Sequence, residues 1–476
     1  MKKFLLIATI LATLYCNNIY SMIPRAFWTV INYMEADNTL AEFSSVDIDE
    51  MIQGLKDAAV VTDARINVLV QLDLPKENKT WRFKIEGTGK IEDESVNQAM
   101  GADPERELVE TAHWIRSKYQ ANHYFWILWS HGSGIEDYRK IRSSNGKIRF
   151  INSWLEIPGY PIIKASSLKK NETQEQKTCN DNASEEDDFK GILYDDSQHS
   201  CLTNQAMTSA FTQIRDILKP GDKLDIIGMD ACLMAMLEIF YQLKDCFHFF
   251  VGSQQLEPSN GWDYTRLLEP LVERADAITA ENLSAIAVEA FGASYAASSE
   301  QNYTQAAVDL SKVEALKTHI DAFVALVDKC AQYKPSTISK AVISARLNTS
   351  CFDNTNYIDL YSFFSEMRKL IGGLVEKINE ATCSCWCNQP PAEYVDALRA
   401  LLANLDAGMQ LIKTQVVIRN TYGHKFIVGP DQLANGVSIY YPNPQKAATA
   451  IHRSYYQIIF AQNSSWLNFI TQYRKN

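Results

Sequence analysis

Short apolar runs alternate with amphipathic stretches through the first 300 residues of the chain. Five runs are rich in β-branched and aromatic residues and are bounded by polar turns, which is typical of buried strands. They cover residues 27–33, 66–72, 124–129, 224–228 and 247–252. Apolar positions at helical spacing predict helices at 46–58, 104–118 and 203–218. This alternation predicts an α/β domain with a mostly parallel central sheet.

The second part of the chain has a different pattern. Long helical patterns cover residues 310–333, 357–381 and 391–411, and short strand patterns cover 415–419 and 436–441. We therefore expect residues 301–476 to form an α+β extension that packs on the sheet. Residues 139–190 break the alternation, because they are rich in charged and small polar side chains. This composition predicts a long exposed insertion.

The N-terminus is typical of an exported protein. Lys2 and Lys3 precede an apolar run at 4–14, which is too short to cross a bilayer and fits a secretory signal peptide at 1–21. Lipidation at Cys16 is the alternative, although the two residues before it match a lipidation signal poorly. No later run reaches the ~18 apolar residues of a membrane helix. We expect a mature chain that is secreted or held in the periplasm or cell envelope.

Charge and cysteine content narrow the function. The formal net charge of −11 argues against a nucleic-acid-binding protein, which needs basic surface to displace counterions. The chain has 10 cysteines. Losing Cys16 with the signal leaves an odd number, so at least one thiol stays unpaired even if disulfides form in an exported protein.

Two strand ends carry groups that could do chemistry. The strand at 124–129 runs into Ser130-His131-Gly132-Ser133-Gly134, where glycines allow a substrate close to the imidazole. The strand at 224–228 leads to Cys232, followed by residues that favour a helix. A helix beginning there would lower the thiol pKa and supply backbone N–H donors to an oxyanion.

Each feature has a structural alternative, because a lone His is often structural and a free Cys is often a small buried hydrophobe. The His and Cys features together indicate a catalytic site more specifically than either does alone. In a parallel sheet, groups that follow neighbouring strands gather at one edge. An imidazole beside a thiol can take its proton and later protonate the leaving amine, which is the minimum machinery for acyl transfer.

Five segments in order along the chain resemble one protein family. They are Trp28–Asn38, Trp129–Gly134, Asp230–Met234, Glu257–Tyr264 and Gly436–Pro442. Taken together, they resemble the clostripain family of cysteine peptidases, in the caspase-like group with gingipains, legumains and separases. The resemblance implies a caspase-like α/β/α sandwich, with a catalytic domain at 22–300 and the extension at 301–476.

The resemblance also implies roles for particular residues. His131 and Cys232 would be the catalytic dyad, and the backbone N–H groups of Gly132 and Cys232 would form the oxyanion hole. Asp230 matches a pocket aspartate that could pair with a substrate guanidinium, because the family cleaves after Arg or Lys. Its alternative role is that of a strand-end or turn residue. Asn260 aligns where relatives can carry an aspartate. The uncharged Asn260 in that place would weaken or shift the preference for basic residues.

Maturation and cofactors follow the same resemblance. Relatives are cut between the His and the Cys, so 139–190 is a candidate activation linker that the enzyme itself could cleave. Cys383, Cys385 and Cys387 favour disulfides over a metal site, since no zinc-finger spacing follows them. Asp37-Asn38 lacks the spacing of an EF-hand. We expect no required cofactor and assign no metal ligands; some relatives use calcium, so a calcium site is left open and unplaced.

These observations predict a secreted cysteine endopeptidase that acts on proteins or peptides with basic residues. Two alternatives remain at this stage. One is a catalytically inactive, caspase-like binding protein of the cell envelope. The other is a peptidase with non-basic specificity, which Asn260 suggests.

Overall fold

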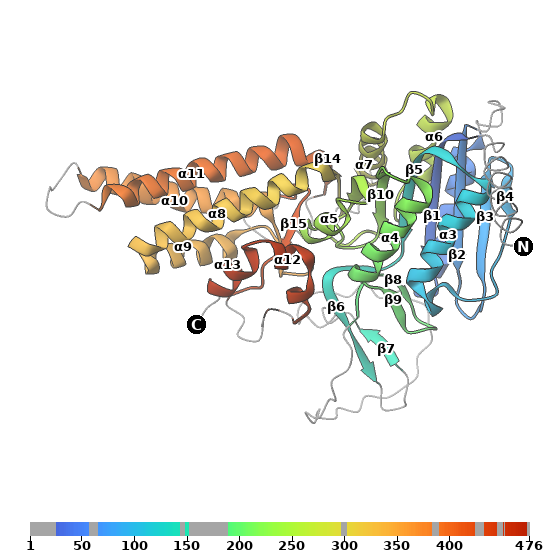
Figure 1. Cartoon of the computed structure of the whole chain (residues 1–476), viewed down its shortest axis with the longest axis horizontal. Helices are drawn as coiled ribbons and strands as arrows, with labels where there is room; N and C mark the ends of the chain where they lie inside the picture. Colours follow the sequence, from blue (N-terminus) through green and yellow to red (C-terminus); the bar gives the residue numbers. More distant parts are fainter. Residues whose placement is uncertain are drawn as a thin grey trace, which may run out of the picture.

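The computed structural model describes residues 25–56, 65–142, 148–151, 189–296, 302–382, 390–423, 433–444, 451 and 453–473. A broad sheet flanked by helices forms one end of the molecule, and long helices from the second half extend away from it (Figure 1). The predicted signal segment at 1–21 lies outside the described residues, as do Cys179, Cys383, Cys385 and Cys387.

A nine-stranded sheet forms the centre of the α/β part, in the order β14-β12-β11-β10-β5-β1-β2-β3-β4. The five middle strands are parallel, and the strands toward both edges pair antiparallel. The strands are β1 (Ala26–Glu35), β2 (Ile66–Asp73), β3 (Thr80–Glu86), β4 (Gly89–Glu92), β5 (Ala121–Trp129), β10 (Leu224–Asp230), β11 (Phe247–Gly252), β12 (Thr304–Asp309) and β14 (Val417–Tyr422). The predicted α/β class with a mostly parallel sheet is confirmed.

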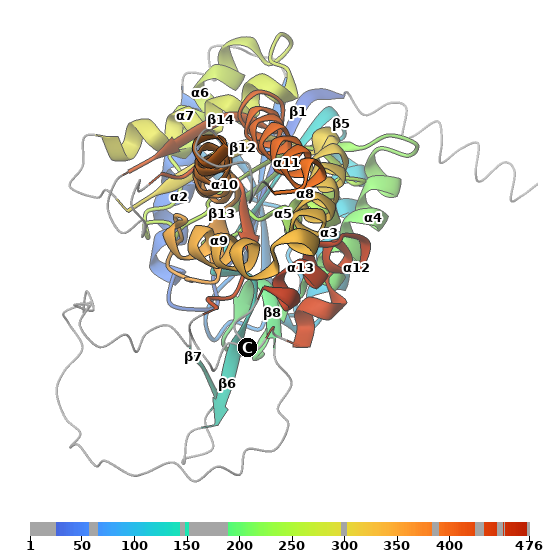
Figure 2. The same cartoon turned by 90° about the vertical axis from the view of Figure 1, so that its left-hand side faces the viewer.

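Helices cover both faces of this sheet (Figures 1 and 2). One layer holds α2 (Ala41–Gly54), α6 (Tyr264–Arg274) and α7 (Ala280–Ala296); the other holds α3 (Pro104–Lys118), α4 (Asn204–Leu218) and α5 (Leu237–Leu243). Alternate residues of β5 enter separate cores, because side chains alternate across a strand. Phe125 and Ile127 pack in the first layer, while Trp126 and Leu128 pack in the second. The result is an α/β/α sandwich.

Helix capping explains why two predicted helices begin where they do. Asp103 accepts a hydrogen bond from the Arg106 N–H, and Pro104 occupies the first helical position of α3. Thr203 caps α4 in the same way through the Ala206 N–H. Helix α2 differs from its prediction, since it begins at Ala41 and ends at Gly54.

The second half of the chain is mainly helical but also completes the sheet. Its helices are α8 (Val313–Tyr333), α9 (Pro335–Asn348), α10 (Leu360–Thr382), α11 (Ala392–Leu411), α12 (Ile459–Asn463) and α13 (Trp466–Gln472), with short turns η3 (Leu310–Lys312) and η6 (Arg453–Gln457). Strands β13 (Tyr357–Asp359) and β15 (Ser438–Tyr440) form a separate antiparallel pair. Strands β12 and β14 belong to the central sheet, so a division at residue 300 falls within one sheet rather than between two.

Four strands between residues 132 and 202 form a second small sheet, with the order β7-β6-β8-β9. Its strands are β6 (Gly132–Arg142), β7 (Ile148–Ile151), β8 (Phe189–Asp195) and β9 (Ser200–Leu202). Figure 2 shows β6 and β7 leaving the body of the molecule. The predicted insertion at 139–190 therefore begins as a strand pair, with Arg139 opposite Ile151, rather than as a loop from its first residue. Residues 143–147 and 152–188 lie outside the described part.

Among the described residues, no helix is long and apolar enough to span a membrane.

Candidate active site

Two neighbouring strands end side by side at the carboxyl edge of the central sheet. Strands β5 and β10 are parallel partners, and Trp129 lies opposite Asp230. The Ser130 N–H then donates to the Asp230 carbonyl oxygen at 3.3 Å, which keeps the two strand ends together beyond the last paired residues. His131 and Cys232 each come two residues after this register pair. The structure thus brings the two predicted site residues to one edge of the sheet.

The glycines after His131 allow the close approach of these two segments. A Cβ atom at Gly132 would lie 2.6 Å from the Cys232 carbonyl oxygen, which is too close for any other residue type. Gly134 has a φ of +66°, and a Cβ there would lie 2.6 Å from Met236 Sδ. Gly132 also pairs with Ile192 across β6 and β8. Its role as an oxyanion donor, like that of the Cys232 N–H, stays a prediction.

The chain after Cys232 corrects one sequence-based expectation. The next helix, α5, begins only at Leu237, so Cys232 does not lie at a helix N-terminus. Leu233 has a φ of +65°. Its N–H donates to Gln255, and the Ala235 N–H donates to Ser253. These tertiary backbone bonds override the helix propensity of the segment.

The thiol of Cys232 is unbridged and half-buried. Burial raises the pKa of Cys232 to about 11, whereas a helix N-terminus would have lowered it. The Glu257 N–H donates to Cys232 Sγ at 3.3 Å. That amide is a contact that the sequence pattern did not predict. The resting thiol is therefore uncharged at neutral pH.

His131 has a partner that the sequence did not reveal. Its Nε2 lies 2.8 Å from Thr39 Oγ1, near the end of the turn between β1 and α2. Burial lowers the pKa of His131 to about 4, so the imidazole is neutral near pH 7. A neutral ring can accept a proton, which is what a general base requires.

Asp230 is held in a fixed position beside the Cys232 turn. It is only 6% exposed. Its Oδ2 accepts hydrogen bonds from the Tyr264 hydroxyl at 2.7 Å and from the Trp262 N–H at 3.3 Å. Gly261, with a φ of +59°, leaves room for the carboxylate, since a Cβ there would lie 2.9 Å from Asp230 Oδ1.

Three further carboxyl groups lie around Asp230, and we call the four residues Asp47, Glu50, Asp230 and Glu257 the acidic cluster. Burial, followed by the charge of Asp230, raises the pKa of Asp47 to about 9 and holds that of Glu257 well above its usual value. Burial also raises the pKa of Glu50 to about 7. Sequence reasoning singled out Asp230, and Glu257 begins one of the motif segments, but Asp47 and Glu50 lie on α2 with no motif around them.

Comparison with known proteins identifies the family of the chain. A sequence profile of the clostripain family matches residues 32–152 and 179–473. The chain belongs to the clostripain family. No curated protein matches it significantly.

Three solved structures share the fold of this clostripain-family chain, each covering 93% of it. One is a secreted C11 cysteine protease from Bacteroides thetaiotaomicron in complex with an irreversible peptide inhibitor. It is 18% identical to this chain, its TM-score is 0.55, and the match covers 100% of its own length. An inactive zymogen C11 protease from Parabacteroides distasonis is 16% identical, with a TM-score of 0.55 over 99%. A further secreted C11 protease from Bacteroides thetaiotaomicron is 13% identical, with a TM-score of 0.57 over 100%. These likenesses establish the fold.

The other residue expected at the substrate site, Asn260, differs from Asp230 in its exposure to solvent. Asn260 is exposed and belongs to a tight turn, closed by the Gly261 N–H donating to the Pro258 carbonyl at 2.9 Å. No hydrogen bond joins Asn260 to Asp230 among the described contacts. Its proposed role in substrate binding is untested.

Proposed function

We propose that this member of the clostripain family is an exported cysteine endopeptidase that hydrolyses peptide bonds after Arg or Lys. His131 and Cys232 are the proposed catalytic dyad. The observation that carries the proposal is the register of β5 and β10, which sets these two residues at equivalent positions beyond paired strand ends. The free thiol of Cys232 supports it, because a cysteine held in a disulfide could not act as a nucleophile.

The chemistry begins with both groups neutral. Substrate binding brings a carbonyl carbon to Sγ; the thiol proton passes to the imidazole, and the sulfur attacks the carbon. The imidazolium then gives its proton to the leaving amine, and a thioester remains on Cys232. Water, deprotonated by the same imidazole, hydrolyses the thioester and regenerates the thiol. Since Thr39 occupies Nε2 in the resting site, the imidazole exchanges that contact for one with the reacting groups.

The acidic cluster is the proposed binding site for the basic side chain before the scissile bond. Its carboxyl groups are crowded and buried, which disfavours their charged forms. A guanidinium or ammonium would relieve this unfavourable state by pairing with Asp230 or Glu257. Because Glu257 contacts Cys232 Sγ through its backbone N–H, a cation held there would lie next to the nucleophile.

The dyad is tested with short fluorogenic peptides ending in Arg or Lys. Cys232→Ala should reduce kcat/KM by at least about a thousandfold, because the covalent step is lost. Cys330→Ala, which removes a buried thiol in α8, is the matched control and should retain activity. Equal turnover by Cys232→Ala and wild type would refute the dyad. Absence of turnover by processed wild type would favour the binding-protein alternative.

Basic specificity is tested at Asp230. Asp230→Asn should lower kcat/KM for an Arg substrate, because one partner of a buried charge pair is lost. The expected loss of transition-state binding is about 2–5 kcal/mol. Asn260→Ala should change kcat/KM only a few-fold, since Asn260 is exposed. A substrate with a neutral residue before the scissile bond is the control. It distinguishes lost recognition of the basic side chain from a general loss of activity. If Asp230→Asn lowers turnover of both substrates equally, Asp230 does not read the basic side chain.

A further inference from the structure

One segment from the second half of the chain reaches both sides of the proposed dyad. It covers residues 349–357, between α9 and the start of β13, and we call it the bridging segment. The hydroxyl of Tyr357 donates to the Ser133 carbonyl at 2.7 Å and accepts from the Ile135 N–H at 3.0 Å. Because Ser133 follows His131 by two residues, these bonds fix the bridging segment behind the imidazole.

The bridging segment is also tied to the turn that carries the nucleophile. The Asp353 N–H donates to Gln255 Oε1 at 2.9 Å. The carbonyl of the same Gln255 accepts a hydrogen bond from the N–H of Leu233, the residue after Cys232, at 3.1 Å. Gln255 is only 1% exposed. A single buried residue therefore holds Asp353 beside the Cys232 turn.

Asp353 differs from most carboxylates of the site because it is both accessible and without a cation. It is half-buried, so part of it reaches solvent. Among the described residues, no lysine, arginine or histidine forms an ion pair with Asp353. Burial raises the pKa of Asp353, since it disfavours the charged form. A cation bound beside it would favour that form.

The charge of Asp353 reaches the nucleophile. Burial is the main cause of the raised pKa of Cys232, and the charges of Asp353 and Asp230 add to it, with Asp353 contributing more. Two carboxylates from different parts of the chain thus act on one sulfur atom. Asp230 belongs to the acidic cluster, whereas the proposed function gives Asp353 no role.

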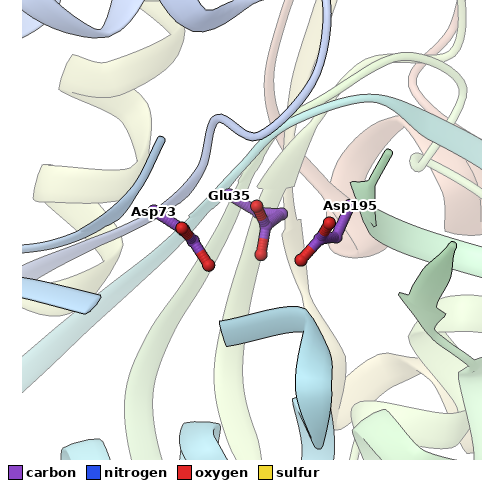
Figure 3. A group of neighbouring side chains, drawn as sticks. All are labelled: Glu35, Asp73 and Asp195. Atoms are coloured by element: carbon purple, nitrogen blue, oxygen red, sulfur yellow. The ribbon is translucent and has the colours of Figure 1, made fainter. Parts of the chain in front are cut away.

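Other carboxylates at this edge of the sheet lie apart from Asp353. Figure 3 shows Glu35, Asp73 and Asp195, which are 2%, 0% and 0% exposed. Glu35 and Asp73 end β1 and β2, which lie beyond β5 in the sheet order. Asp353 is instead bonded to the segment that follows β11, on the opposite side of β10. The enclosed group in Figure 3 therefore does not compete with Asp353 for a substrate side chain.

We propose that Asp353 is a specificity-determining residue that binds a second positively charged side chain of the substrate, within two positions of the basic residue before the scissile bond. This inference rests on the proposed function, because it needs a peptide held at Cys232. The acidic cluster would bind one basic side chain and Asp353 the other. Neighbouring side chains of an extended peptide point in opposite directions, so they can reach separate carboxylates. The preferred substrates would then be peptides with two basic residues close together.

Internally quenched peptides test the second charge. The reference peptide has one Arg before the scissile bond and alanines around it, and four others carry one Lys at one of the two positions on either side. Wild type should have a kcat/KM about fivefold higher for Lys than for Ala in at least one position. Asp353→Asn should bring this ratio close to one. Asp396→Asn is the matched control, because it removes the same charge from an exposed site on α11, and it should keep the ratio. Mass spectrometry of the products checks that cleavage stays after the Arg.

The ratio is the measured quantity because Asp353 also affects the thiol. Removing its charge should lower the pKa of Cys232 and change the turnover of every peptide by the same factor, which leaves the ratio unaltered. The same effect gives a measurement without substrate. Alkylation of Cys232 by iodoacetamide near pH 8 should be a few-fold faster in Asp353→Asn than in wild type. Asp396→Asn should react as wild type does.

The proposal is overturned if no Lys position raises kcat/KM of wild type, or if Asp353→Asn keeps the full preference. The first of these outcomes needs only wild type, so a misfolded variant cannot protect the proposal. Equal alkylation of Cys232 in wild type and Asp353→Asn would also contradict it, since the carboxylate would then lie too far from the sulfur. No cleavage of the reference peptide refutes the proposed function and this inference together. Cleavage without a preference for the second charge refutes this inference alone.

Discussion

At the scale of single residues, burial sets the charge state of the proposed dyad. It raises the pKa of Cys232 to about 11 and lowers that of His131 to about 4, so both groups are neutral over a wide range around pH 7. Burial thus favours a neutral thiol and a neutral imidazole at rest over a thiolate–imidazolium pair. In the proposed mechanism, the thiol proton therefore has to pass to the imidazole only after the substrate has bound.

This charge state predicts how Cys232 reacts without substrate. Because a raised thiol pKa leaves little thiolate, alkylation of Cys232 by iodoacetamide should rise about tenfold per pH unit from pH 7 to 10. A free cysteine, with a pKa of about 8.5, should level off above pH 9 and serves as the reference. The measurement is mass spectrometry of the labelled peptide from uncut protein. A rate that is already constant between pH 6 and 8 would mean that a thiolate–imidazolium pair exists at rest.

At the scale of elements, the strands were more predictable than the turns between them. Strand β11 and helix α3 match their predicted bounds, because an apolar run or an Asp-Pro start is a local signal. The helix expected directly after Cys232 was wrong, since Leu233 and Ala235 bond to a segment about 20 residues ahead. Thr39, as the partner of His131, could not be predicted for the same reason, because the contact joins residues that are distant in sequence.

The approach of the two site segments gives a prediction at Gly132. Gly132→Ala should reduce activity strongly while the protein stays folded, because the added Cβ forces the His131 and Cys232 segments apart. Gly372→Ala is the control, since a Cβ in that part of α10 meets no atom within 4 Å. It should leave activity unchanged and stabilise the helix by about 0.5–1 kcal/mol. Denaturant unfolding and peptide turnover measure both effects, and full activity in Gly132→Ala would contradict the close approach.

At the scale of the whole molecule, the central sheet is built from both sides of the 139–190 interval. Strands β1, β2 and β5 precede it, and β10, β11, β12 and β14 come after it. The two groups meet where β5 pairs with β10, deep inside the sheet. A cut in the interval therefore breaks the chain without breaking the sheet.

Self-cleavage in 139–190 is the corresponding prediction. Purified wild type should give two bands on a denaturing gel, whereas Cys232→Ala should stay intact because the nucleophile is gone. The two wild-type fragments should nevertheless elute together on size exclusion, held by the β5–β10 ladder and the cores on both faces. Equal fragmentation of both proteins would rule out self-processing. Fragments that separate without denaturant would contradict the role given to the ladder.

The pairing of Trp129 with Asp230 also bears on how such proteins can diverge. The relative position of His131 and Cys232 follows from a hydrogen-bonded register, so the length of the stretch that joins β5 to β10 does not determine it. Evolution can lengthen, shorten or rewrite that stretch while the chemistry keeps its geometry. Distant relatives should therefore be recognised by the residues just beyond each of two adjoining strands, and counting residues from one motif to the other would overlook them.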